Sequence, residues 1–178
     1  MTAAKPGYSG NLTSTLARDN ALQVRTKGGD WTFVRGLSQL SPTFAGEMQD
    51  DSDIDGEGYA SNISTGQTFT ITLEGLRKGE GTGEDFTEDP GQAILRQAGN
   101  STGFDNILEA RTWRTDGTGE AYEANFSVEY ATQPGDRVSL DKFSATLTSR
   151  GKPQRIEIVT DAEAESVPFG TDPEDGED

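Results

Sequence analysis

The chain contains neither cysteine nor histidine among its 178 residues. Without cysteine it has no disulfides, thiol nucleophiles or thiolate metal sites, and without histidine it lacks the commonest general base and metal ligand. It also has no apolar run near the roughly 20 residues of a membrane-spanning helix, and its first thirty residues lack a long apolar secretion signal. We therefore expect a soluble, non-membrane protein with no cofactor, no metal site and no catalytic residues.

Hydrophobic residues are scarce. They make up 31% of the chain, and even with its 22 glycines the total stays below the usual fraction of about 45–50% on that count. A chain of this length forms one ordinary domain that can bury most of its apolar surface. The lean composition indicates that neighbouring subunits supply part of the stability.

Basic residues are missing from three strongly acidic stretches, while the whole chain carries a formal net charge of −16. The acids of these stretches are Glu47, Asp50, Asp51, Asp53, Asp55 and Glu57; then Glu80, Glu84, Asp85, Glu88 and Asp89; then Asp161, Glu163, Glu165, Asp172, Glu174, Asp175, Glu177 and Asp178. Binding to a phosphate backbone by counterion release needs clustered Lys and Arg, so we expect this protein to repel DNA.

Hydrophobic alternation predicts a mainly β domain over residues 20–160, preceded by an arm over 1–19 and followed by an acidic tail over 161–178. We expect seven or eight strands, with a polar loop after Pro42 and a bulge near Asp141. The expected strands span residues 22–25, 31–33, 68–73, 107–114, 122–130, 138–147 and 156–158.

One short helix is indicated after the second acidic stretch. Asp89 can cap its N-terminus, Pro90 suits the first helical position, Gln92 gives a capping-box spacing and Gly99 can close the C-terminus. Its apolar stripe consists of Ile94, Leu95 and Ala98. No helix alternates with the strands, which predicts an antiparallel β-sandwich or open barrel with one short α-helix.

The spacing of Asp51, Asp53, Asp55 and Gly56 matches the first half of a calcium-binding EF loop. The twelfth position, Asn62, cannot supply a bidentate carboxylate, so a plain acidic loop is favoured over a calcium site. A glycosidase-like carboxylate pair is disfavoured because these acids lie in exposed, mutually repelling stretches. A phosphate-binding loop at 79–83 is excluded because no lysine and no helix start follow it.

The larger aromatic residues allow two interpretations. Trp31, Trp113, Tyr122 and Tyr130 could form a platform for sugar or single-stranded nucleic acid, but their places on strands favour core packing. Arg111 and Arg114, beside Trp113, offer a weaker cation–π or interface interpretation.

Six segments together resemble the major tail tube protein of long-tailed, non-contractile (siphovirus-type) bacteriophages. These segments are WTFVRG at 31–36, DDSDIDG at 50–56, GYAS at 58–61, TGQTFTI at 65–71, DPGQAILR at 89–96 and SATLTSRGKP at 144–153. The similarity runs from about residue 20 to 160 and consists of turns and alternations, with no catalytic signature.

This resemblance implies a structural virion protein of the tail tube, made in the host cytoplasm. Such proteins form hexameric rings that stack around a channel for genome delivery, with strands in a continuous barrel and a helix outside. Their partners are further copies of themselves and other tail proteins such as the tape measure and tail terminator. DNA passes through without specific binding.

By position, residues 45–58 would be the acidic loop that reaches an adjacent ring, with Glu47, Asp50, Asp51, Asp53, Asp55, Glu57 and Tyr59 in contact. The basic residues available as partners are Arg25, Lys27, Arg35, Arg77, Lys78, Arg111, Arg114, Arg150, Lys152 and Arg155. The chief alternative function is a β-sandwich adhesion module that binds carbohydrate or calcium. A hydrolase using carboxylates is a more distant one.

Overall fold

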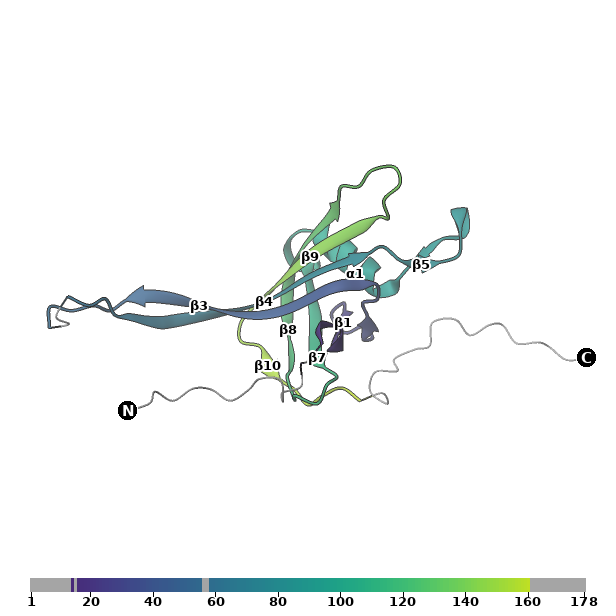
Figure 1. Cartoon of the computed structure of the whole chain (residues 1–178). Coiled ribbons are helices and arrows are strands. Elements are labelled where there is room, and N and C mark those ends of the chain that lie inside the picture. Colours follow the sequence, from purple (N-terminus) through teal and green to yellow (C-terminus); the bar gives the residue numbers. More distant parts are fainter. Residues whose placement is uncertain (1–13, 15, 56–57, 161–178) are drawn as a thin grey trace, which may run out of the picture.

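A computed structural model of the chain describes residues 14, 16–55 and 58–160 (Figure 1). Its strands are β1 (Asn20–Arg25), β2 (Thr32–Phe33), β3 (Leu37–Asp50), β4 (Asn62–Leu76), β5 (Gly79–Glu80), β6 (Thr87–Glu88), β7 (Ile107–Arg114), β8 (Ala121–Gln133), β9 (Lys142–Ser149) and β10 (Gln154–Arg155). The α-helix among these residues is α1 (Pro90–Gly99), and short 3-10 turns lie at Ala17–Asp19, Gly83–Asp85 and Gly103–Asn106. The predicted mainly β class is confirmed, with ten strands where seven or eight were expected.

Eight of the strands form one antiparallel sheet in the order β2-β1-β7-β8-β9-β4-β3, with β10 pairing with β8 beside β9. The sheet curls on itself. This is shown by Phe44 on edge strand β3 and Tyr122 on β8, whose ring centroids lie 5.2 Å apart although two strands separate β3 from β8. Strands β5 and β6 form a separate hairpin. Of the two predicted architectures, the open barrel describes this single curled sheet.

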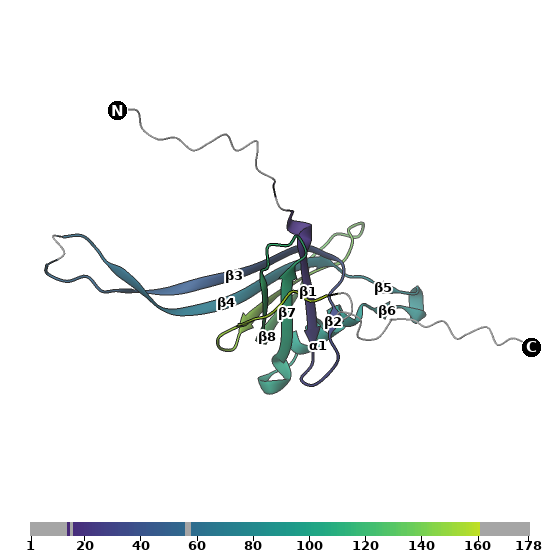
Figure 2. The same ribbon diagram turned by 90° about the horizontal axis from the view of Figure 1, so that it is seen from below.

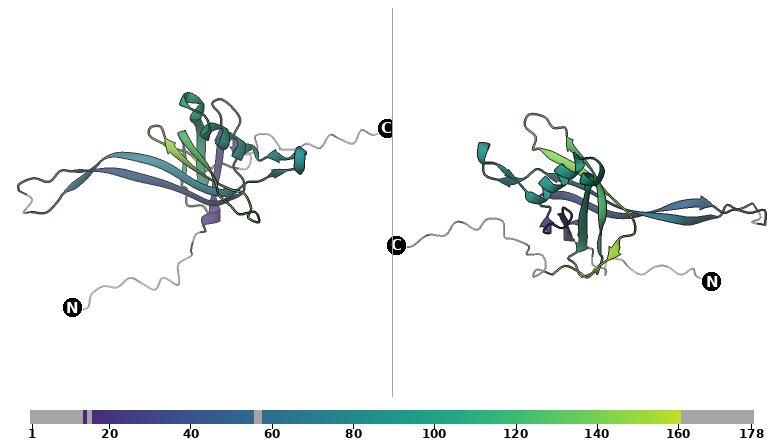
Figure 3. Two further views of the ribbon diagram at one scale, coloured as in Figure 1. Left: turned by 90° about the horizontal axis from the view of Figure 1, so that it is seen from above. Right: turned by 180° about the vertical axis from the view of Figure 1, so that it is seen from behind.

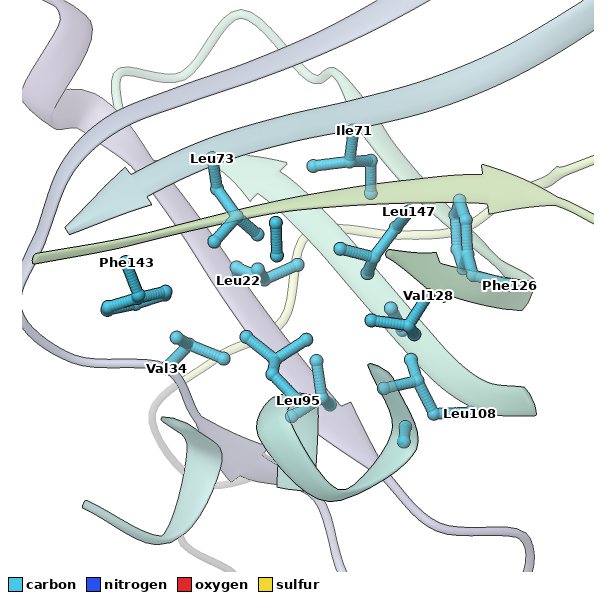
Figure 4. Close-up of a cluster of buried hydrophobic side chains, with 14 of the residues drawn as sticks. Leu22, Val34, Ile71, Leu73, Leu95, Leu108, Phe126, Val128, Phe143 and Leu147 are labelled. Atoms are coloured by element: carbon cyan, nitrogen blue, oxygen red, sulfur yellow. The ribbon is translucent and has the colours of Figure 1, made fainter. Parts of the chain in front are cut away.

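The core lies inside the curl, with α1 packed across it (Figure 4). Leu22, Ile71, Phe126 and Leu147 are buried there together with Leu95 from the helix. The alternation predicted for residues 68–73 and 122–130 is confirmed, because antiparallel strands bury one face and leave the other polar.

The start of α1 is as predicted, but its end differs. Asp89 accepts a hydrogen bond from the Gln92 N–H at 3.2 Å, and Pro90 is the first helical residue. Gly99 is the last helical residue rather than a residue beyond the helix, and Asn100 is the C-cap. A Cβ on Gly99 would lie 2.3 Å from the Cβ of Tyr130, so close packing on β8 explains this glycine.

Gln92 does not complete a capping box. Its buried side chain donates to the Arg35 carbonyl at 2.7 Å and the Leu76 carbonyl at 3.0 Å, and accepts from the Lys78 N–H at 3.1 Å. The amide therefore ties α1 to the start of β3 and the end of β4.

The expected loop over residues 45–58 is wrong for its first part. Strand β3 continues to Asp50, and β4 begins at Asn62 rather than Thr68. Residues 44–50 and 62–69 pair with each other as a two-stranded ribbon and are mostly exposed on both faces. They therefore lack the one-sided hydrophobic alternation from which a strand can be predicted.

Two further strand predictions are wrong. Val138 and Leu140 lie in the β8–β9 loop, 87% and 70% exposed, so no bulge forms near Asp141. Asp136 organises this loop by accepting from the Ser139 hydroxyl at 2.6 Å and the Val138 N–H at 3.1 Å. The last strand is Gln154–Arg155, and the following Ile156 and Ile158 pack around Trp113 instead.

The predicted N-terminal arm and acidic tail lie almost wholly outside the described residues, as does Glu57. Within the described part of the chain, no helix is long and apolar enough to cross a membrane.

Candidate assembly surfaces

The β3–β4 hairpin projects far beyond the sheet. Strand β4 pairs with β9 only over Thr70–Leu76, whereas its pairing with β3 continues outward from Phe44↔Phe69 to Asp50↔Asn62. We call the projecting part, residues 44–55 and 58–69, the arm (Figures 2 and 3). Among the described residues, each strand of the arm has the other as its sole strand partner, so both outer edges offer free backbone groups beyond Phe69, whose N–H donates to the Ser149 hydroxyl at 3.3 Å.

Large hydrophobic side chains on the arm are exposed. Their exposed fractions are 43% for Phe44, 65% for Met48, 100% for Ile54, 80% for Tyr59 and 53% for Ile63. Phe44 packs one side of its ring on Phe69 at the root, with centroids 4.5 Å apart. Apolar side chains gathered on a projecting ribbon indicate a surface that another molecule covers.

The tip of the arm is acidic and held by local hydrogen bonds. Asp50, Asp51, Asp53 and Asp55 are all exposed. The Asp51 N–H donates to the Ser61 carbonyl at 3.1 Å, and the Ser61 N–H donates to the Ser52 hydroxyl at 2.8 Å. Hydrogen bonding by Ser52, through its side chain and then its backbone N–H, lowers the pKa of Asp50 and favours its charged form.

No group of three or more carboxylates converges on a possible cation position within residues 14, 16–55 and 58–160. Asn62, the twelfth position of the EF-like spacing, begins β4 and pairs with Asp50.

Five of the ten basic residues predicted to contact the acidic loop already bind a group within their own chain. Arg25 pairs with Glu109, and Arg114 pairs with Asp116. Arg77 contacts Glu88 at 3.3 Å and Asp141 at 2.9 Å. The remaining two donate to uncharged acceptors, Arg111 to the Gln23 side chain at 2.7 Å and Arg155 to the Gly119 carbonyl at 3.3 Å.

The other five basic candidates are exposed. These five residues are Lys27, Arg35, Lys78, Arg150 and Lys152. Their side chains make no ion pair or hydrogen bond to any described residue. Sequence reasoning could not separate these five from the engaged ones, because several of the pairings join residues far apart in the chain, such as Arg25 with Glu109 and Arg111 with Gln23.

Three of the five line connected open grooves at one end of the barrel. Lys27 in the β1–β2 turn, Phe104 in the turn after α1, and Arg150 in the β9–β10 turn surround Ile107. The adjoining groove continues past Arg150 to Lys152. The β1–β2 turn and the turn after α1 lie at this end in Figure 2. We call Lys27, Phe104, Ile107, Arg150 and Lys152 the loop-end groove; sequence reasoning missed Phe104, which is 85% exposed.

A second surface is the sheet face opposite the core, which is lined by hydroxyl side chains. One row across β8, β9 and β4 consists of Ser127, Thr148 and Thr70, and the next of Glu129, Thr146 and Thr72. These residues alternate with the buried ones, as predicted for the threonines of β4. We call this the polar face.

The aromatic residues are mostly packed, as the core interpretation predicted. Trp113 is buried, Tyr122 packs on Phe69, and Tyr130 stacks on Phe143. The Arg111 guanidinium carbon lies 5.9 Å from the Trp113 ring centroid, as the cation–π interpretation predicted. It lies closer to the Trp31 ring, at 4.5 Å, and Arg25 lies 4.1 Å from the same ring. Arg114 is occupied by Asp116 instead.

The second acidic stretch forms the β5–β6 hairpin, which projects away from the arm (Figure 1). Glu88 at its base accepts from Arg96 at 2.7 Å and from Arg77 at 3.3 Å. Glu80, Glu84 and Asp85 stay exposed, so both projections of the molecule are negative at their ends.

No protein-family model and no curated protein matches the sequence. Solved structures do match the fold. A chain in the tail of an empty gene transfer agent particle, refined with helical and C6 symmetry, has a TM-score of 0.63 at 12% identity, covering 80% of this chain and 99% of that one. A chain of the native gene transfer agent virion has a TM-score of 0.58 at 16% identity, covering 79% and 97%.

A chain of the six-fold symmetrised anti-feeding prophage baseplate also matches, with a TM-score of 0.53 at 8% identity, covering 80% of this chain and 95% of that one. At these identities the similarity establishes a shared fold. That fold occurs in chains of phage-like tail and baseplate assemblies.

Proposed function

We propose that this chain is the major subunit of a phage-like tail tube of the siphovirus type. Its copies form hexameric rings that stack around a channel for genome delivery, and the protein performs no catalysis. The observation that carries this proposal is the arm, which has unpaired edges and exposed apolar side chains that a lone molecule leaves uncovered. The shared fold with tail and baseplate chains supports the same conclusion.

Ring closure uses the edges of the main sheet. Strand β3 has no partner on its outer side among the described residues, and β2 covers β1 only at Gln23 and Val24. Joining these edges between neighbouring copies would extend the sheet around a ring and satisfy free backbone groups.

The polar face supplies the wall of the channel. Its hydroxyl rows suit contact with water, and Glu74 and Glu129 on this face add negative charge that disfavours adhesion of nucleic acid. DNA would then pass without specific binding. Other tail proteins, such as the tape measure and the tail terminator, would set where the tube starts and stops within the virion.

The direct test is the assembly state of the purified, tag-free chain at high concentration. Sedimentation and negative-stain microscopy should detect six-fold rings and hollow tubes. A protein that stays monomeric, even with the tail components that initiate tube growth, would refute the proposal.

Tube formation should depend on ionic strength. Exposed charges between stacked copies are screened beyond roughly 10 Å at 0.1 M salt, so the polymer fraction should fall steadily as sodium chloride is raised from low to molar concentration. The pelleted fraction after ultracentrifugation measures this effect. Polymerisation that is independent of salt would mean that stacking does not rely on the acidic tip.

A further inference from the structure

The loop-end groove combines positive charge with exposed apolar surface. Lys27, Arg150 and Lys152 have no partner among the described residues, and Phe104 lies beside them with 85% of its surface exposed. Glu109, which pairs with Arg25, and Glu123 are the carboxylates that line these grooves, and Asp105 lines a further groove shared by Lys27, Phe104 and Ile107. The groove therefore presents three cations around an apolar centre.

The arm tip has the complementary chemistry. Asp51, Asp53 and Asp55 are exposed acids, and Ile54 and Tyr59 among them are 100% and 80% exposed. We infer that the loop-end groove of one copy receives the arm tip of a second copy, with the three carboxylates facing the three cations and the apolar side chains packing on Phe104. This inference rests on the proposed self-assembly and assigns its inter-ring contact.

Four other cations without ion pairs are less suitable receivers. Lys78 directly precedes the acidic β5–β6 hairpin, and the Arg35 backbone lies 3.5 Å from the Asp89 carboxylate. Arg137 and Lys142 flank the β8–β9 loop, but Asp136 and Asp141 alternate with them there. Negative charge beside each of these cations opposes docking of an acidic tip.

A charge-swap experiment tests the docking. Asp51→Lys/Asp53→Lys/Asp55→Lys reverses the tip, and Lys27→Glu/Arg150→Glu/Lys152→Glu reverses the groove. Each triple variant should reduce tube formation by about tenfold or more, because like charges would face each other. Combining all six changes in one chain should restore it. All six side chains are exposed, so monomer melting temperatures should stay close to that of the wild type.

The lack of cysteine gives a clean background for crosslinking. Assembled Asp53→Cys/Lys152→Cys protein should form intermolecular disulfides on mild oxidation, and the matched control Asp53→Cys/Arg137→Cys should not.

The docking assignment would be overturned if the variant with all six substitutions did not regain tube formation, or if crosslinking through position 137 were preferred. Wild-type tubes would in that case still support the proposed function. A wild-type chain that never assembles would overturn both.

Discussion

Replacing residues 51–61 by an Asn-Gly turn is expected to abolish tube elongation while changing the free energy of unfolding of the monomer by less than about 0.5 kcal/mol. Every described residue in this segment is exposed, and the change keeps the Asp50↔Asn62 pair at the end of the ribbon. Asn-Gly is the preferred two-residue connection between antiparallel strands. Urea unfolding measures the stability, and negative-stain microscopy measures tube length.

A length-preserving variant separates the charge of the tip from its shape. Asp51→Asn/Asp53→Asn/Asp55→Asn keeps the exposed Ile54 and Tyr59 and should slow elongation without abolishing it. Tubes of normal length from the Asn-Gly variant would show that the tip has no part in stacking.

Gln92→Leu is expected to lower the free energy of unfolding by about 3–5 kcal/mol. Leucine has a similar size but cannot bond the Arg35 and Leu76 carbonyls or the Lys78 N–H, and each such group left unpaired costs about 1–3 kcal/mol. The hydrogen bonds to the Arg35 carbonyl and the Lys78 N–H are only partly buried, so water can reach these two groups. The expected loss of stability is therefore smaller than three times the upper cost of about 3 kcal/mol.

The matched control is Gln97→Leu, on the exposed side of the same helix, which should change stability by less than about 0.5 kcal/mol. Thermal and urea unfolding of both variants provide the comparison. A loss below about 1 kcal/mol for Gln92→Leu would mean that water replaces the amide at all three sites.

The strands that could be predicted from sequence are those with one buried face. Phe69, Ile71 and Leu73 alternate with threonines because that stretch of β4 lies between the core and the polar face. The outer half of the same strand has no core beside it, so its polar, glycine-containing sequence resembles a loop. Pairing with β3 makes it a strand, and this pairing joins two polar stretches of one hairpin that no hydrophobic alternation marks.

The acidic tip was visible in the sequence, but the loop-end groove was not. Lys27, Phe104 and Arg150 come from three separate turns, which the curled sheet brings to one end. Whether an arginine is available also depends on tertiary structure, as the pairing of Arg25 with Glu109 across two strands illustrates. The role of Gln92 was predicted wrongly for the same reason, since its partners lie in the segment before β3 and at the end of β4.

Strand β4 runs from the tip of the arm into the main sheet, where β9 and β3 flank it. A pull applied at the tip along the strand would load the hydrogen bonds over Thr70–Leu76 in shear, so that they resist together instead of peeling one by one. In the proposed tube, tension between stacked copies would thus be carried into the buried core of each subunit, a mechanical property useful in a long, narrow filament.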